Sequence, residues 1–270
     1  QYELAIADFT ASLELHADDG WTLAQRGLAY RDQGDLAAAI ADLTRAIERG
    51  KKEAWVYDGR GQAYRLNNQL AEAIADLTTS LELSPNSVWT LNERGRAHRM
   101  NGQYAEAIAD LTQSLARSSN PAWVLRERGQ SYRLKGELDA AIADLSASLE
   151  REPNSAWALS QRALAYREKG VYPQALADLT RALEIDASDP WMHAQRGIAR
   201  RMAGQFEPAI ADLTQALDMG KKEGWVYAQR GVARRRLDRL DDAVADLDEA
   251  ELEAGGRGIV VAAIRTQSLT

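Results

Sequence analysis

Apolar residues recur along this chain at steps of three and four residues, in stretches separated by single turn-forming residues. Between Trp21 and Glu48, one such stretch lies on each side of Gly34. This spacing places apolar side chains on one face of a helix. It predicts two amphipathic helices, helix A over roughly residues 20–33 and helix B over roughly residues 36–49.

The same pattern returns every 34 residues. All seven tryptophans of the chain follow this spacing: Trp21, Trp55, Trp89, Trp123, Trp157, Trp191 and Trp225. A single helix pair cannot bury its apolar face alone, so neighbouring pairs must stack, and this period predicts an all-α solenoid of helix-turn-helix repeats. We number the positions of a repeat from 1 at Gly20, which places tryptophan at position 2.

The turn between the two helices is encoded at position 15. It holds residues that tolerate a left-handed backbone: Gly34, Asn68, Gly102, Gly136, Gly170, Gly204 and Asp238. Position 8 of helix A and position 20 of helix B hold only glycine or alanine. Because Ala163 replaces glycine once at position 8, the requirement is for low bulk, which predicts a close crossing of the two helices.

Gly27, Tyr30, Ala39, Leu43 and Ala46, with their equivalents in the other units, resemble the tetratricopeptide repeat over essentially the whole chain. The resemblance implies a right-handed superhelix whose concave wall is formed by helices A. One feature departs from the family, whose tryptophan usually stands at position 4. Leucine, tyrosine or histidine fills that position here, so the tryptophan at position 2 is additional to the expected core.

The pattern divides the chain into three parts. Residues 1–15 match helix B alone, so we expect a preceding helix A in a longer protein. Residues 20–254 form seven full repeats, which start near residues 20, 54, 88, 122, 156, 190 and 224. Residues 255–270 keep the phase of the repeat after a glycine-rich break, and we expect a linker and a degenerate capping helix.

Two charged positions lie 16 residues apart in every repeat. Position 7 is arginine: Arg26, Arg60, Arg94, Arg128, Arg162, Arg196 and Arg230. Position 23 is aspartate: Asp42, Asp76, Asp110, Asp144, Asp178, Asp212 and Asp246. The helical period turns position 7 toward helix B, so we predict an ion pair within each repeat rather than a ligand site.

Position 12 is also arginine in every full repeat: Arg31, Arg65, Arg99, Arg133, Arg167, Arg201 and Arg235. Positions 2 and 12 fall within about 100° on helix A, on the side that the resemblance assigns to the concave groove. On one interpretation, these tryptophans and exposed arginines bind an extended or acidic partner. On a second, compatible interpretation, each arginine stacks on a neighbouring tryptophan as a cation–π brace.

Position 6 lies beside this candidate surface. It holds Gln25, Gly59, Glu93, Glu127, Gln161, Gln195 and Gln229. One interpretation is a row of amides that contacts a bound backbone, and the simpler one is a solvated face. Positions 5 and 9 vary between repeats, as expected for a groove that contacts different partner side chains or for an unselected surface.

Composition and net charge limit the classes of function that this chain can have. The formal net charge of −7 and the pI near 5.2 disfavour a general nucleic-acid binder. The chain has no cysteine, and its three histidines lack the spacing of metal ligands. No apolar run reaches the roughly 18 residues of a membrane span. We therefore expect no enzyme activity, no cofactor, no metal site and no membrane contact.

The sequence predicts a non-catalytic protein–protein interaction scaffold, a sensor or adaptor region of a larger cytoplasmic protein of bacterial type. The expected partner is a protein or extended peptide, of acidic character if the arginines bind it. Two other functions stay open: phosphate or nucleic-acid binding through tryptophan and arginine, and a structural module that self-associates. The identity of the partner is not encoded in these patterns.

Overall fold

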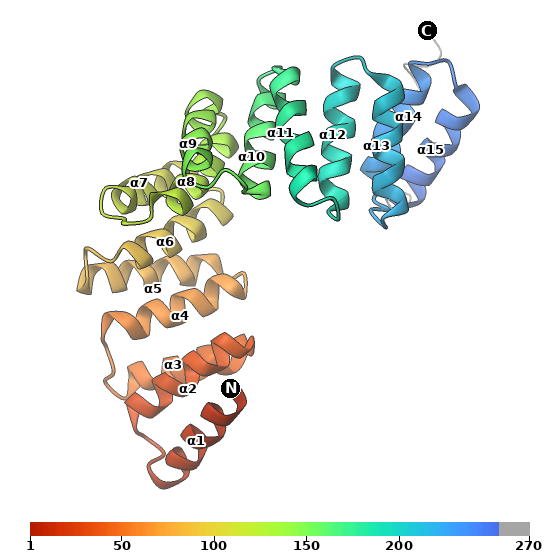
Figure 1. Cartoon of the computed structure of the whole chain (residues 1–270). Coiled ribbons are helices and arrows are strands. Elements are labelled where there is room, and N and C mark those ends of the chain that lie inside the picture. Colours follow the sequence, from red (N-terminus) through yellow and green to blue (C-terminus); the bar gives the residue numbers. More distant parts are fainter. Residues whose placement is uncertain (254–270) are drawn as a thin grey trace. The chain divides into compact units, whose positions relative to one another are not determined.

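The computed structural model describes residues 1–253, which form helices joined by short turns, without a strand in that range (Figure 1). The all-α class of helix-turn-helix repeats is confirmed. The chain divides into two compact units, residues 1–136 and residues 137–270, which we describe separately. The linker and capping helix expected over residues 255–270 lie outside the described residues.

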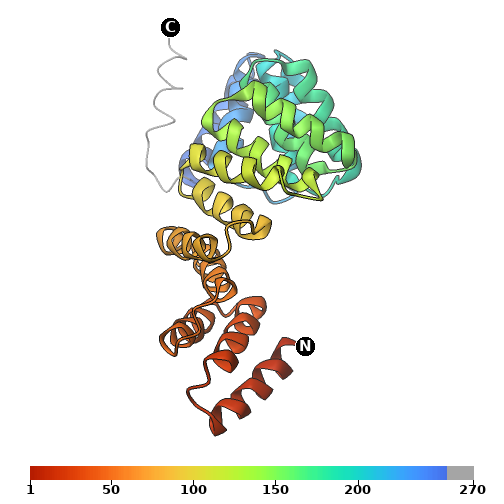
Figure 2. The same cartoon turned by 90° about the vertical axis from the view of Figure 1, so that its left-hand side faces the viewer.

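The first unit runs from the N-terminus through helix α8. Its helices are α1 (Tyr2–Leu15), α2 (Gly20–Gln33), α3 (Leu36–Glu48), α4 (Ala54–Leu66), α5 (Leu70–Leu83), α6 (Val88–Met100), α7 (Tyr104–Leu115) and α8 (Pro121–Lys135). Figure 2 shows the same helices from a second direction, and in both views each lies beside its neighbours in sequence.

The second unit is described as far as residue 253. Its helices are α9 (Leu138–Arg151), α10 (Ala156–Glu168), α11 (Tyr172–Ile185), α12 (Pro190–Met202), α13 (Phe206–Asp218), α14 (Gly224–Arg235) and α15 (Leu240–Glu253). Within the described range, no helix combines the length and the apolar character that a membrane span requires.

Within each unit, each helix A packs against the helix B that follows it, and each helix B packs against the next helix A. Successive A helices also touch one another, as α2, α4, α6 and α8 do in the first unit and α10, α12 and α14 in the second. We call the surface formed by the A helices within each unit its A-helix face. Its side chains are therefore set by contacts between repeats as well as within them.

Position 15 has the left-handed backbone that its residue types predict. The φ angle is 97° at Gly34, 60° at Asn68 and 56° at Asp238. A Cβ atom added at Gly34 would meet no atom within 4 Å, so the backbone conformation, and not lack of space, favours glycine there. These residues end helix A and reverse the chain into helix B.

Low bulk at position 8 allows the close helix crossing that we expected. A Cβ atom at Gly61 would lie 2.8 Å from Cγ of Leu77 and 3.3 Å from the carbonyl oxygen of Ala73. Leu77 is fully buried, as are its equivalents Leu43, Leu111, Leu145, Leu179 and Leu213. The core leucine thus lies directly beneath the glycine, and the core clusters extend into the neighbouring repeats, as in the cluster that joins Leu13, Leu43 and Val56.

Candidate functional site

The predicted ion pair between positions 7 and 23 is confirmed. Arg26 donates from Nε to Oδ2 of Asp42 at 2.6 Å and from Nη2 to Oδ1 at 3.0 Å. The same ion pair joins Arg60 to Asp76, Arg94 to Asp110, Arg162 to Asp178, Arg196 to Asp212 and Arg230 to Asp246. Arg128 and Asp144 belong to different units, and their pairing stays a prediction.

The arginine at position 7 also contacts the preceding repeat. Nη1 of Arg60 donates to Oγ1 of Thr44 at 3.1 Å, and the guanidinium of Arg60 lies 5.7 Å from the ring centre of Tyr64. Hydrogen bonding to Asp76 raises the pKa of Arg60 above its ordinary value. Sequence reasoning missed the threonine, although hydroxyl residues recur with the same period at position 25. This arginine is a structural centre that links three helices.

The tryptophans lie near the start of each helix A and are only partly buried. Trp21 is 50% exposed, Trp89 56% and Trp157 40%. Trp55 is half-buried and packs against a core cluster that includes Leu23 and Leu43 of the preceding repeat. Position 2 therefore contributes to the contact between repeats and leaves aromatic surface in solvent.

A pocket of about 540 Å³ lies in the second unit between Trp157 and Trp191. Its lining also includes Ser160 at position 5 and Gln161 at position 6. Asp189 lies at its rim, where it caps helix α12 by accepting a hydrogen bond from the backbone nitrogen of Trp191 at 2.8 Å. A pocket lined by two aromatic side chains and a few polar groups has the chemistry to accept an apolar group.

The arginines at position 12 do not stand free in solvent as we expected. Nε of Arg65 donates to Oε2 of Glu93 at 2.9 Å, with 10% and 2% of the two side chains exposed. Arg99 donates to Glu127 at 3.1 Å, and Arg167 donates to Gln195. Each partner stands at position 6 of the next repeat, because stacking of A helices brings these positions together. The expectation of exposed guanidinium groups is therefore wrong for Arg65 and Arg99.

The solvated face expected at position 6 is also wrong. Glu93 is 1% exposed, Glu127 8% and Gln195 7%. These side chains lie between successive A helices, where they accept hydrogen bonds from the position-12 arginines. The row of amides and carboxylates is therefore part of the contact between repeats.

The structure does not interleave tryptophan and position-12 arginine as one surface row. Positions 2 and 12 lie ten residues apart in one helix, about 15 Å along its axis. Two tryptophans make cation–π contacts with residues at other positions. Arg96 lies 6.0 Å from the ring centre of Trp123, and Lys51 lies 5.8 Å from the ring centre of Trp55. The A-helix face thus has a tryptophan row at one end of its helices and an arginine row toward the other.

The first unit contains a partly buried acidic group, Asp58, that no sequence motif indicated. Oδ2 of Asp58 accepts a hydrogen bond from Nε2 of Gln62 at 2.6 Å, and its Oδ1 is buried without a hydrogen-bond partner. Burial raises the pKa of Asp58, and the nearby Glu93 carboxylate raises it further. Position 5 varies between repeats, so the sequence pattern gave no signal for this group.

Comparison with known families agrees with this geometry. Models described as tetratricopeptide repeat match residues 24–88 and 77–109, and a model described as TPR repeat matches residues 163–204. The chain is a tetratricopeptide repeat protein. Arrays of this class generally mediate protein–protein interactions and are usually non-catalytic. No curated protein gives a significant match to the whole sequence.

Solved structures show the same fold at low sequence identity. A tetratricopeptide repeat protein from Parabacteroides merdae ATCC 43184 is 20% identical, with a TM-score of 0.74 over 93% of this chain and 99% of that one. A chain of the APC/C hetero-tetramer Cut9–Hcn1 is 18% identical, with a TM-score of 0.74 over 100% of this chain and 53% of that one. YrrB, described as a TPR protein with an unusual peptide-binding site, is 22% identical, with a TM-score of 0.56 over 66% of this chain and 92% of that one.

Proposed function

We propose that this protein is a non-catalytic scaffold of the cytoplasm that binds a protein or an extended peptide on its A-helix face. The tryptophan row supplies the anchors, because large aromatic side chains bury much apolar area at little cost in conformational entropy. A peptide-binding site described for YrrB and the Cut9–Hcn1 assembly support this proposal by analogy.

The observation that supports it best is the pocket between Trp157 and Trp191. The pocket of about 540 Å³ is lined by Trp157, which is 40% exposed, and by Trp191, which is partly buried, so an apolar group bound there would cover aromatic surface that is otherwise in solvent. The pocket accepts an apolar side chain of the partner. Ser160 and Gln161 also line the pocket, where their buried side chains belong to the scaffold that holds the two tryptophans.

The test begins with peptides selected on the complete 270-residue chain from a random phage-displayed library. We expect Trp157→Ala and Trp89→Ala each to weaken binding of the selected peptides at least about tenfold, as interface anchors do. Leu83→Ala is the matched control, since Leu83 is 54% exposed at the end of a B helix. Its peptide affinity should equal that of the unaltered chain.

Two further readouts separate binding from folding. The helicity and melting temperature of the tryptophan variants should stay close to those of the unaltered chain, because the replaced rings are half in solvent. Tryptophan fluorescence should become less accessible to acrylamide when peptide binds. Selected peptides that bind both tryptophan variants with unchanged affinity would exclude the tryptophan row as the binding surface.

A further inference from the structure

Contacts between positions 12 and 6 fall into two electrostatic classes. In the first unit, Arg65 and Arg99 donate to the carboxylates of Glu93 and Glu127, so their positive charges are compensated inside the protein. In the second unit, position 6 holds glutamine. Arg201 therefore faces the neutral side chain of Gln229, and no carboxylate of the described chain pairs with it.

Arg201 and Gln229 each leave a buried polar atom unsatisfied. Nε of Arg201 is a buried donor without a hydrogen-bond partner among the described residues, and it is the atom that an anion can satisfy. Oε1 of Gln229 is also buried and unpartnered among those residues, but as an acceptor it does not bind an anion itself. Burial lowers the pKa of Arg201, and the nearby positive charge of Arg236 lowers it further. A partly buried cation without a counter-charge is destabilising, so this site favours a ligand that supplies the missing negative charge.

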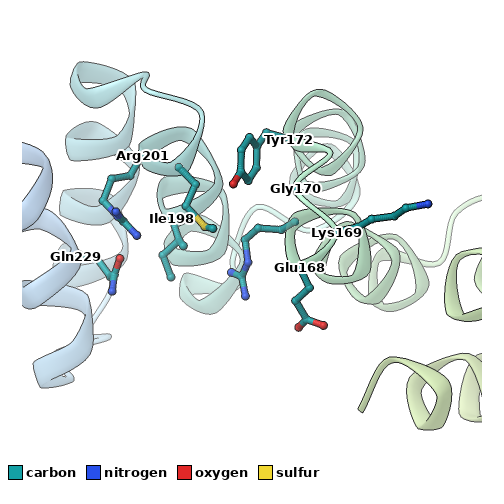
Figure 3. Close-up of a pocket in the computed structure, with 9 residues that line it drawn as sticks. Glu168, Lys169, Gly170, Tyr172, Ile198, Arg201 and Gln229 are labelled. Carbon is teal, nitrogen blue, oxygen red and sulfur yellow. The ribbon is translucent and has the colours of Figure 1, made fainter. Parts of the chain in front are cut away.

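A pocket of about 510 Å³ opens beside these groups. In Figure 3 the polar ends of Arg201 and Gln229 lie on one side of it, and the hydroxyl of Tyr172 turns toward the same space. Lys169 extends away from the pocket and pairs with Asp139. Ile198 contributes apolar wall, which lowers the local dielectric and strengthens a charge-assisted hydrogen bond.

We propose that Arg201, Gln229 and Tyr172 form a binding site for one anionic group, a carboxylate or a phosphate. The guanidinium supplies forked donors that match two oxygens of such a group, and the amide nitrogen and the phenol supply single donors. Arg167, which also lines the pocket, adds a second positive charge. The inference rests on the proposed function only in assigning the anion to the same A-helix face.

The test titrates the complete chain with inorganic phosphate and, separately, with acetate. Two signals are followed: the melting temperature, and the NMR resonance of the Nε–H group of Arg201, assigned by comparison with Arg201→Lys. At least one anion should shift that resonance saturably and raise the melting temperature with concentration, since a ligand that binds only the folded state stabilises it. A response to phosphate alone supports a phosphoryl ligand, and a response to acetate supports a carboxylate.

Gln229→Glu is the decisive variant, because it gives Arg201 the internal carboxylate that Glu93 gives Arg65. It should lower anion affinity at least about tenfold, which is the effect of losing one charge-assisted contact. Gln215→Glu is the matched control, because it makes the same charge change at an exposed site on helix α13. It should bind anions as the unaltered chain does.

The converse variant is Glu93→Gln, which removes the carboxylate from Arg65. It should acquire a phosphate- or acetate-dependent rise in melting temperature at the first unit. This gain would support the rule that a position-12 arginine facing a neutral residue binds an anion.

Failure of this inference differs from failure of the proposed function. If neither anion shifts the Arg201 resonance while selected peptides still require Trp157, the anion site is refuted and the scaffold stands. If anions bind the unaltered chain, Gln229→Glu abolishes anion binding, and the tryptophan variants keep full peptide affinity, the anion site is supported and the tryptophan row is refuted as the peptide-binding surface. Equal anion affinity in Gln229→Glu and the unaltered chain would also refute the site.

Discussion

Arg65 donates from Nε to Oε2 of Glu93 at 2.9 Å, although the two residues lie 28 apart in sequence. The bond joins helix α4 to helix α6, the A helices of successive repeats. Glu93 also accepts a hydrogen bond from Arg96 at 3.3 Å, so one buried carboxylate holds two guanidinium groups. This cluster connects successive A helices through charged side chains, in addition to the apolar contacts between repeats.

Glu93→Gln should lower the free energy of unfolding by about 3 kcal/mol, because it leaves the buried Arg65 without a counter-charge. Urea denaturation followed by circular dichroism measures this change. Glu72→Gln, at an exposed position in the first turn of helix α5, is the control and should change stability by less than about 0.5 kcal/mol. Equal effects of the two substitutions would show that the Glu93 cluster contributes nothing to stability.

Asp110→Ala should destabilise more than Asp139→Ala. Asp110 is 4% exposed and accepts from Arg94 at 2.7 Å and 2.8 Å, whereas the side chain of Asp139 is 83% exposed. We expect a loss of about 3–5 kcal/mol for the buried pair and about 0–1 kcal/mol for the exposed one. A double-mutant cycle on Arg94 and Asp110 checks the assignment, and additive effects would contradict it.

Asp58→Asn should change how stability depends on pH. Because burial raises the folded-state pKa of Asp58, its ionised form destabilises the fold at neutral pH, and protonation removes this cost. The stability contribution of Asp58 is thus complete below the ordinary value of 3.8 and is lost as pH rises through the folded pKa.

The asparagine that replaces Asp58 in this variant does not titrate, so Asp58→Asn should gain stability relative to the unaltered chain as pH rises from 3.8 toward neutrality. Urea denaturation across this range measures the difference in the free energy of unfolding. Replacing Asp58 also changes the hydrogen bond to Gln62, but that cost does not depend on pH. The change of the difference with pH therefore reports only the titration of Asp58. A difference that stays constant with pH would mean that Asp58 titrates as a solvated carboxyl group.

Gly197→Ala should lower stability by about 1–2 kcal/mol, since its Cβ would lie 2.7 Å from Cγ of Leu213 and 3.2 Å from the carbonyl oxygen of Ala209. Gly59→Ala is the control, because its closest contact is the mobile end of Leu28. In Gly59→Ala, the gain in helix propensity should offset the cost of displacing the end of the Leu28 side chain. Thermal melting of the two variants tests this, and a smaller loss at Gly197 than at Gly59 would contradict the close-crossing interpretation.

Features that lie within one repeat could be predicted from the sequence. The left-handed residue at Gly34, the small residue at Gly61 and the pairing of Arg94 with Asp110 all follow from a helix pair whose partners recur in phase. The hydroxyl partner of position 7, as in Thr44, has the same periodic signal and could have been found.

Contacts between repeats could not be predicted from the sequence pattern. Alignment of the repeats shows that position 12 is always arginine, but not which residue of the next helix A lies opposite it. Burial of Glu93 depends on that stacking, and a helical wheel for helix α6 alone places it at the border of the polar side. The sequence therefore carried no signal for the burial of Arg65 against Glu93.

The repeated pairing of positions 12 and 6 has an evolutionary consequence. Gly59, Glu93, Gln195 and Gln229 occupy one structural slot within one chain, so the molecule already tolerates a neutral, a small and an acidic residue there. A single codon change from glutamate to glutamine at this slot converts a charge-neutral step of the array into a cationic one. For the anion site that we propose, selectivity for a charged ligand can thus change one repeat at a time through substitution of a single residue at position 6.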